Sequence, residues 1–264
     1  MELNPKQKQL LNADVTVWGR GFGARALAKA FGLTRNMPRA IVINWGCVDD
    51  SVDDSDIILN SKHAIRQCSD KYGALVKMQE AGVPVPRHTR NMQDVIDGAC
   101  GEKIITRRKY HTKGLDIKGP FDHADETAWN ANWQHHAVEF LESEKEYRYH
   151  VVLGRVILAT VKMRRDAEGD ERYRLPQGMV KRNWQHGYWK QVSCPVRPSC
   201  ETVALEAVRA LGLTFGAVDI IISQGRPFVL EVNARPGIDA HLDVYVQAFY
   251  DTLATLLPLN DLLR

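Results

Sequence analysis

The chain lacks the features that mark several specialised classes of protein. Its five cysteines, at positions 47, 68, 100, 194 and 200, form no C-x-x-C pair. An odd number of scattered cysteines argues against a disulfide framework or a zinc knuckle and favours a reducing compartment. No apolar run approaches the roughly 18 residues of a membrane span, and none follows the basic residues near the N-terminus. We therefore expect a cytoplasmic protein with no membrane partner.

The chain also has little excess charge. Lysine and arginine number 35 and aspartate and glutamate 32, so the formal net charge is +3. Such an excess does not by itself indicate a nucleic-acid partner. There is no internal repeat or low-complexity segment. The 264 residues, 44% of them hydrophobic, fit one large globular domain or two small ones.

The first 60 residues have the pattern of a small parallel α/β unit. We expect an N-terminal domain over residues 1–60, with strands at 13–18, 40–44 and 57–59 and a helix at 24–31.

Between the first strand and the helix lies a glycine-rich turn, Gly19–Gly23. Its spacing is G-x-G-x-G rather than the G-x-G-x-x-G of dinucleotide-binding folds, and no acidic residue ends the second strand. A dinucleotide-binding oxidoreductase is therefore the least favoured interpretation. Backbone N–H groups at the helix start, with Arg20, could bind a substrate carboxylate. Tight-turn glycines without a ligand are an equal alternative.

The sequence after residue 60 predicts a helix, then a series of strands, and finally a part that contains both helices and strands. A helix is expected to begin near Ser69 and end at Gly82, before an extended V-P-V-P-R segment. Further strands are expected at 103–108, 136–141, 216–223 and 227–233, with a hairpin around 153–156 and helices at 200–211 and 242–257.

The segment 215–237, FGAVDIIISQGRPFVLEVNARPG, carries the strongest chemical signal. A three-residue loop, Gln224–Arg226, joins two β-rich runs. If Ser223 pairs with Pro227, Ile221 lies opposite Val229 and Asp219 lies opposite Glu231. Asn233, two residues beyond Glu231, then projects from the same face.

Two carboxylates on facing strands repel each other unless a cation lies between them. Oxygen ligands of this kind, completed by phosphate oxygens, suit magnesium. Arg235 lies one step further along the same face and could reach a phosphate or a carboxylate. The alternative is an exposed hairpin face, which the mostly apolar neighbours disfavour.

This hairpin resembles the metal-binding hairpin of the ATP-grasp enzymes, in which an acidic residue is followed twelve positions later by E-x-N. Its E-V-N-A-R-P-G motif is most similar to the corresponding segment of the RimK-type amino-acid ligases. The resemblance implies an α/β fold, α+β in parts. It consists of the small N-terminal α/β domain, a connecting helix and mobile lid over 61–140, and a C-terminal antiparallel-sheet domain over 141–264. It also implies ATP and two magnesium ions, replaceable by manganese, held by Asp219, Glu231 and Asn233.

Further segments resemble the family's nucleotide site. Asp70-Lys71, followed by A-G-V-P-V-P, precedes the lid. Arg107 stands where RimK-type ligases carry a lysine, seven residues before Gly114, and Arg108 and Lys109 are alternatives to it. The loop has only one glycine to cradle phosphate with its backbone, and Lys113 and His111 are expected to compensate. The segment from residue 136 resembles the adenine-binding linker. The resemblance implies that ATP contacts Lys71, Arg107, Lys113, Glu139, Phe140, Glu142 and Glu146, the last of these at the ribose.

Basic residues after the linker resemble those that neutralise the γ-phosphate and the acyl phosphate in RimK-type ligases. They are Lys162, Arg164 and Arg182, to which Arg235 is added as a catalytic candidate. The alternative is a nucleic-acid patch on which Trp184, Tyr188 and Trp189 stack bases.

Taken with the family resemblance, these motifs lead us to expect an ATP-dependent carboxylate–amine ligase that forms an amide or peptide-like bond through an acyl phosphate and releases ADP and phosphate. Its substrates would be small molecules or peptides, and a homo-oligomer is compatible with the sequence. The alternatives are an ATP-grasp kinase or carboxylase-like enzyme and a nucleic-acid-associated modification protein. The sequence does not name the carboxylate or the amine.

Overall fold

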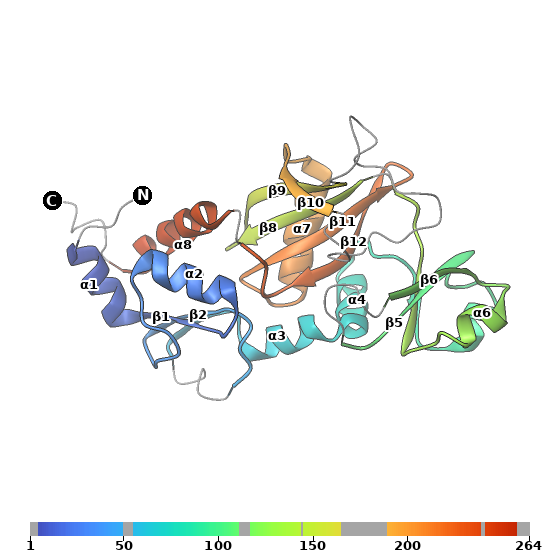
Figure 1. Ribbon diagram of the computed structural model, residues 1–264, viewed down its shortest axis with the longest axis horizontal. Coiled ribbons are helices and arrows are strands. Elements are labelled where there is room, and N and C mark those ends of the chain that lie inside the picture. The colour runs from blue at the N-terminus through green and yellow to red at the C-terminus, as the bar shows by residue number, and fades with distance from the viewer. Residues whose placement is uncertain are drawn as a thin grey trace.

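A computed structural model describes residues 5–49, 55–110, 117–143, 145–164, 189–238 and 241–257. Three sheets follow one another along the long axis of the molecule (Figure 1). A three-stranded sheet lies at one end, a five-stranded sheet in the middle and a four-stranded sheet at the other end. Within the described ranges, no helix is both long and apolar enough to cross a membrane.

The N-terminal sheet is parallel, as its pattern predicts. Its strands β1 (Val15–Trp18), β2 (Ile41–Asn44) and β3 (Ile57–Leu59) pair in chain order. Helix α2 (Phe22–Phe31) follows the glycine turn and ends at Gly32, which has the left-handed φ of 70° that favours glycine. Helix α1 (Pro5–Asp14) was not predicted, because its polar sequence buries only Gln7 and Leu11.

The C-terminal helix α8 (Leu242–Leu256) completes the core of this N-terminal unit. It packs against α2 (Figure 1), so residues from both ends of the chain share one hydrophobic cluster. Trp45 stacks on Phe215 with ring centroids 5.0 Å apart, and Tyr245 and Phe249 pack around them. The N-terminal unit is therefore held directly to the central sheet.

The central sheet is antiparallel and has the order β10-β9-β8-β11-β12. Its strands are β8 (Glu146–Val152), β9 (Arg155–Arg164), β10 (Trp189–Ser193), β11 (Phe215–Ser223) and β12 (Arg226–Asn233). On β8, the side chains of Tyr147, Tyr149 and Val151 enter the core beside helix α7 (Pro198–Ala210). Because strand side chains alternate, Glu146 and Arg148 project from the opposite face. One face of the sheet is thus apolar, and the other carries charge.

The hairpin β11–β12 corrects part of the predicted register. Its turn consists of two residues, Gln224 and Gly225, with φ values of 49° and 76°. Ser223 therefore pairs with Arg226 and Ile221 with Phe228, so the predicted partners Pro227 and Val229 were wrong by one residue. A β-bulge between Asp219 and Ile220 adds one residue to β12 and places Asp219 opposite Glu231, as predicted.

The four-stranded sheet has the order β4-β7-β5-β6. Its strands are β4 (His88–Thr89), β5 (Lys103–Arg107), β6 (Ile117–Asp122) and β7 (His136–Glu139), flanked by the short helices α5 (Met92–Ile96) and α6 (Glu126–Asn130). Helices α3 (Lys62–Ser69) and α4 (Lys71–Glu80) connect it to the N-terminal sheet (Figure 1). The single predicted helix thus begins at Lys71, where the Asp70 side chain accepts a hydrogen bond from the Gly73 N–H. The domain boundaries at 60 and 140 stay predictions.

Candidate active site

Two carboxylates and a carboxamide meet on the charged face of the central sheet. Asp219 on β11 faces Glu231 on β12. The Asn233 side-chain amide donates to Glu231 Oε1 at 3.1 Å and to Asp219 Oδ2 at 3.4 Å. Asp219 is 3% exposed, so its carboxylate is almost wholly removed from solvent. The three groups thus converge, as the strand pattern predicts.

Arg148 on β8 binds the buried carboxylate of Asp219 on the neighbouring strand β11. Its Nε and Nη2 donate to the two carboxylate oxygens of Asp219 at 2.6 and 2.7 Å. Burial opposes the charge on Arg148, but Asp219 outweighs that effect and raises the pKa of the guanidinium. Sequence reasoning missed this residue, although Glu146, Arg148 and His150 alternate with apolar neighbours in a pattern that marks a polar strand face.

Arg107 reaches the same cluster from the four-stranded sheet. It ends β5, and its Nη2 lies 3.0 Å from Glu231 Oε2. Its side chain is 5% exposed, and burial lowers its pKa although Glu231 opposes the shift. The resemblance placed Arg107 on a phosphate, and the structure places it on a carboxylate that is itself predicted to hold magnesium.

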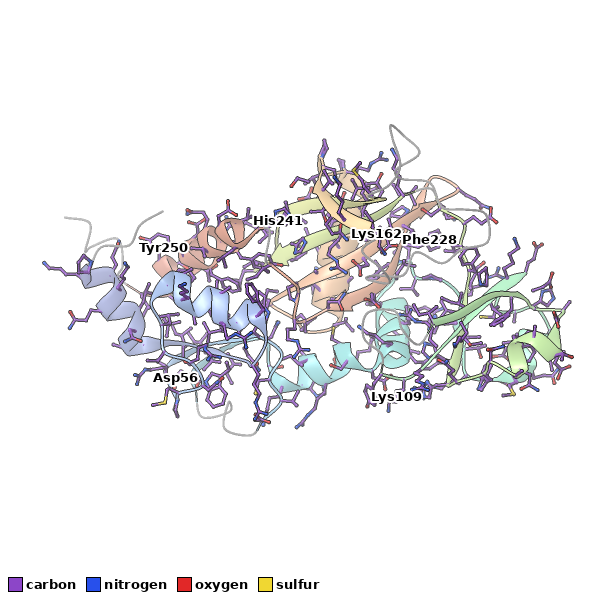
Figure 2. The ribbon with its side chains drawn as sticks, in the orientation of Figure 1. Asp56, Lys109, Lys162, Phe228, His241 and Tyr250 are labelled. Carbon is purple, nitrogen blue, oxygen red and sulfur yellow. The ribbon has the colours of Figure 1, made fainter. Side chains whose placement is uncertain are left out.

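Two other predicted site residues bind each other. Lys162 on β9 donates from Nζ to Glu146 Oε1 on β8 at 2.8 Å. Their side chains are 2% and 9% exposed, so this is a buried ion pair. Figure 2 shows Lys162 within the central sheet. The pair continues the charged face by one strand from the Arg148–Asp219 contact.

The predicted adenine contacts lie at and just after the end of β7, beside the start of β5. Glu139 accepts from Arg87 Nε and Nη2 at 3.1 and 2.6 Å, and Glu142 lies 3.4 Å from Lys103 Nζ. The backbone N–H of Phe140 donates to the Lys103 carbonyl at 2.8 Å. The nucleotide-binding roles of Glu139, Phe140 and Glu142 stay predictions.

Lys71 and Arg235 both lie near the end of β12. Lys71 Nζ donates to the Val232 carbonyl at 3.2 Å, so this lysine contacts the strand backbone of the hairpin. Arg235 is exposed and lies beside the N-terminal unit: a Cβ added at Gly46 would be 3.0 Å from its Cβ and Cδ. Gly21 of the glycine turn would approach the same side chain at 3.7 Å. The turn therefore adjoins the end of the hairpin that carries the acids.

Several predicted residues lie outside the described part of the chain. These are Lys113, Arg182, His111, Trp184 and Tyr188, together with the side chains of Arg164 and Trp189. Their proposed contacts with phosphate or nucleic acid stay predictions.

The acidic cluster fits a hard cation. Two carboxylates and an amide oxygen are ligands that magnesium takes, and it completes its octahedral shell with water and phosphate oxygens. Within the described ranges, no group of three or more histidine, cysteine, aspartate or glutamate side chains could enclose a metal. Asp219, Glu231 and Asn233 supply only part of an octahedral shell, which leaves positions for the oxygens of a phosphate-bearing substrate.

Comparison with known proteins agrees with this geometry. No family model matches the chain. It is 30% identical over 196 residues to a probable alpha-L-glutamate ligase of Vibrio vulnificus (strain YJ016), covering 69% of this chain and 60% of the relative. A probable alpha-L-glutamate ligase of Legionella pneumophila (strain Corby) is 27% identical over 192 residues, with the same coverage. The chain thus spans about three fifths of the length of these relatives.

Solved structures of ATP-grasp ligases share the fold. D-cycloserine synthetase DcsG has a TM-score of 0.65 at 16% identity, covering 91% of this chain and 99% of its own. The ATP-grasp ligase PsnB, complexed with a minimal precursor, has a TM-score of 0.64 at 15% identity and the same coverage. The predicted fold class is confirmed. The chain therefore has the fold of these ATP-grasp ligases, and its sequence is similar to those of probable alpha-L-glutamate ligases over the matched residues.

Proposed function

We propose that this protein is an ATP-dependent ligase that joins a carboxylate to an amine through an acyl phosphate. The observation that carries the proposal is the meeting of Asp219, Glu231 and Asn233 on one sheet face, with Arg107 and Arg148 against the two acids. Similarity to glutamate ligases supports the reaction class.

The proposed reaction needs charge positioning more than a protein nucleophile. A substrate carboxylate oxygen attacks the γ-phosphorus of ATP, and the bond to the ADP oxygen breaks. An amine nitrogen then attacks the acyl carbon, phosphate leaves with the bridging oxygen, and the amine proton passes to solvent. Magnesium, when bound, neutralises phosphate oxygens along this path.

Each residue has a definite part in this scheme. Asp219, Glu231 and Asn233 hold the ions, and Arg148 fixes the Asp219 carboxylate in its plane by the two-point contact. Lys162, held beside Glu146, adds positive charge to the same face, and Arg235 stands at its edge. Positioned charges in a site shielded from water supply most of the catalysis in phosphoryl transfer.

The substrates are a carboxylate and an amine that belong to small molecules or peptides. The relatives are described as probable alpha-L-glutamate ligases, and PsnB is complexed with a minimal precursor, magnesium and ADP in one structure. Glutamate and short peptides are therefore the first substrates to test.

The test is ADP release from magnesium-ATP across pools of amino acids and short peptides. A ligase releases ADP only when a carboxylate and an amine are both present. ADP release that needs no amine would indicate a kinase instead, and no release with any pair would refute the proposal. Nucleic-acid binding that is independent of ATP and weakens steeply with salt would favour the nucleic-acid alternative.

A further inference from the structure

Donors that belong to the protein already satisfy the carboxylates of the acidic cluster. Arg107 Nη2 donates to Glu231 Oε2 at 3.0 Å, and Arg148 donates to both oxygens of Asp219. The Asn233 amide donates to Glu231 Oε1 and to Asp219 Oδ2. All four carboxylate oxygens therefore accept a hydrogen bond. A magnesium ion would use the same oxygens, so the protein donors and the ion compete for them.

The formal charges of the four ionised side chains cancel. Arg107 and Arg148 carry one positive charge each, and Asp219 and Glu231 carry one negative charge each. A divalent cation that entered alone would meet two guanidinium groups that repel it at short range. Arginine does not lose its proton in proteins, so a guanidinium can make room only by moving.

Arg107 is better placed to move than Arg148. Arg148 lies on β8, beside β11 in the same sheet, and holds Asp219 by a two-point contact. Arg107 ends β5 of the four-stranded sheet and reaches across to Glu231 on the central sheet. Glu231 is also the more accessible acid, because its side chain is 19% exposed and that of Asp219 is 4% exposed. The contact between the two sheets is therefore the one that can be exchanged.

A displaced Arg107 needs another anion beside it. Its side chain is 5% exposed, and a buried guanidinium without a counterion is costly. Burial already lowers its pKa, and Glu231 opposes that shift. A substrate that shares the ion with Glu231 carries phosphate, and a guanidinium matches phosphate oxygens by two parallel hydrogen bonds. The phosphate can thus replace the carboxylate that Arg107 gives up.

We propose that Arg107 is an exchangeable counterion, which holds Glu231 until a divalent ion and a nucleotide phosphate arrive together. In the exchange, the hydrogen bond from Arg107 to Glu231 breaks, Glu231 accepts the ion, and the guanidinium pairs with a phosphate. Asn233 turns its amide so that its oxygen replaces its N–H group at the cluster. The ion alone binds weakly, because it brings no new partner for Arg107. The proposal rests on the proposed function and adds a device that admits the ion only with its nucleotide.

Binding of manganese without nucleotide tests the proposal, with free manganese followed by electron paramagnetic resonance. Arg107→Gln removes the charge but keeps an N–H group for Glu231, and Arg107→Lys keeps the charge. Lys118→Ala is the matched control, because Lys118 is an exposed cation that pairs with Thr106 across β5 and β6. Calorimetry with magnesium and a non-hydrolysable ATP analogue gives a second readout on the same proteins.

We expect the two ligands to respond in opposite directions. Manganese alone should bind Arg107→Gln about fivefold or more tightly than the wild type, and Arg107→Lys and Lys118→Ala should bind it as the wild type does. The magnesium analogue should bind Arg107→Gln about tenfold more weakly. A residue needed only for folding would weaken both ligands, and one that only binds phosphate would leave manganese unchanged. Either result would overturn the proposal.

Nitrogen-15 NMR of the arginine side chains tests the exchange in the wild type, without a substitution at Arg107. One guanidinium signal, absent from Arg107→Lys, should shift with the magnesium analogue and stay in place with magnesium alone. A signal that does not shift with the analogue would overturn the proposal.

Failure of the exchange can be told from failure of the metal site. Equal manganese affinity in Arg107→Gln and the wild type, with analogue binding that still requires Glu231, would refute the exchange and leave the metal site intact. Tighter manganese binding that persists in Arg107→Gln/Glu231→Gln would place the ion elsewhere and refute both.

Discussion

Breaking the buried ion pair between Lys162 and Glu146 should destabilise the central sheet strongly. Lys162 Nζ lies 2.8 Å from Glu146 Oε1, and the two side chains are 2% and 9% exposed. Removal of one partner leaves the other charge buried without its counterion, at a cost of about 3–5 kcal/mol. Lys162→Met keeps the length of the side chain, so we expect a loss of that size. At about 2–4 °C per kcal/mol, the melting temperature should fall by about 6–20 °C.

The double variant Lys162→Met/Glu146→Leu separates charge from packing. A buried pair replaced by apolar groups of similar size is often close to neutral, so we expect the double variant to lie within about 2 kcal/mol of the wild type. Urea unfolding, followed by circular dichroism and tryptophan fluorescence, measures the four stabilities of the cycle. A loss under about 1 kcal/mol in Lys162→Met, or a double variant as unstable as the sum of the singles, would refute the reasoning.

Three further changes follow from the structure. Burial lowers the pKa of His150 to about 3, from a usual value of 6.5, so the unfolded chain binds its proton first. The free energy of unfolding, relative to that of His150→Asn, should therefore be highest above pH 6.5 and fall by about 1.4 kcal/mol per pH unit toward pH 3. Urea titrations at each pH measure it. Arg148→Met leaves Asp219 buried without its two-point partner, and we expect about 3–5 kcal/mol lost and ADP release abolished; near-wild-type unfolding would contradict this. Gly225→Ala should cost about 1 kcal/mol, because the residue has a φ of 76° and no atom crowds the added methyl group, and an unchanged melting curve would show that the turn relaxes freely.

Local sequence patterns predict the central hairpin well because a strand repeats every two residues. Glu231 and Asn233, two residues apart on one strand, could be placed on one face from spacing alone, whereas the position of Asp219 opposite them depends on the register of the hairpin. The turn could not be predicted in detail, since Gln224 adopts a left-handed φ of 49° that glutamine seldom takes. The bulge beside Asp219 then offset the one-residue error, and local sequence gives no sign of it.

The partners of the charged residues depend on contacts between distant segments. Arg107 and Glu231 are 124 residues apart, and Arg148 and Asp219 are 71 apart. Local sequence patterns do not show which distant residues are in contact. The charged residues could therefore be identified from the sequence, but their ion-pair partners could not. Helix α8 was predicted as a helix, but its packing on the N-terminal unit also required the tertiary structure.

Binding of a non-hydrolysable ATP analogue, measured by calorimetry with and without magnesium, tests the central claim most directly. Glu231→Gln is the informative variant, because glutamine keeps an oxygen for Arg107 while it removes the charge that would hold the ion. We expect magnesium-dependent binding in the wild type and an affinity at least about tenfold weaker in Glu231→Gln, with the circular dichroism spectrum unchanged. Equal affinity and equal magnesium dependence in the two proteins would contradict the assignment of this hairpin as the metal site.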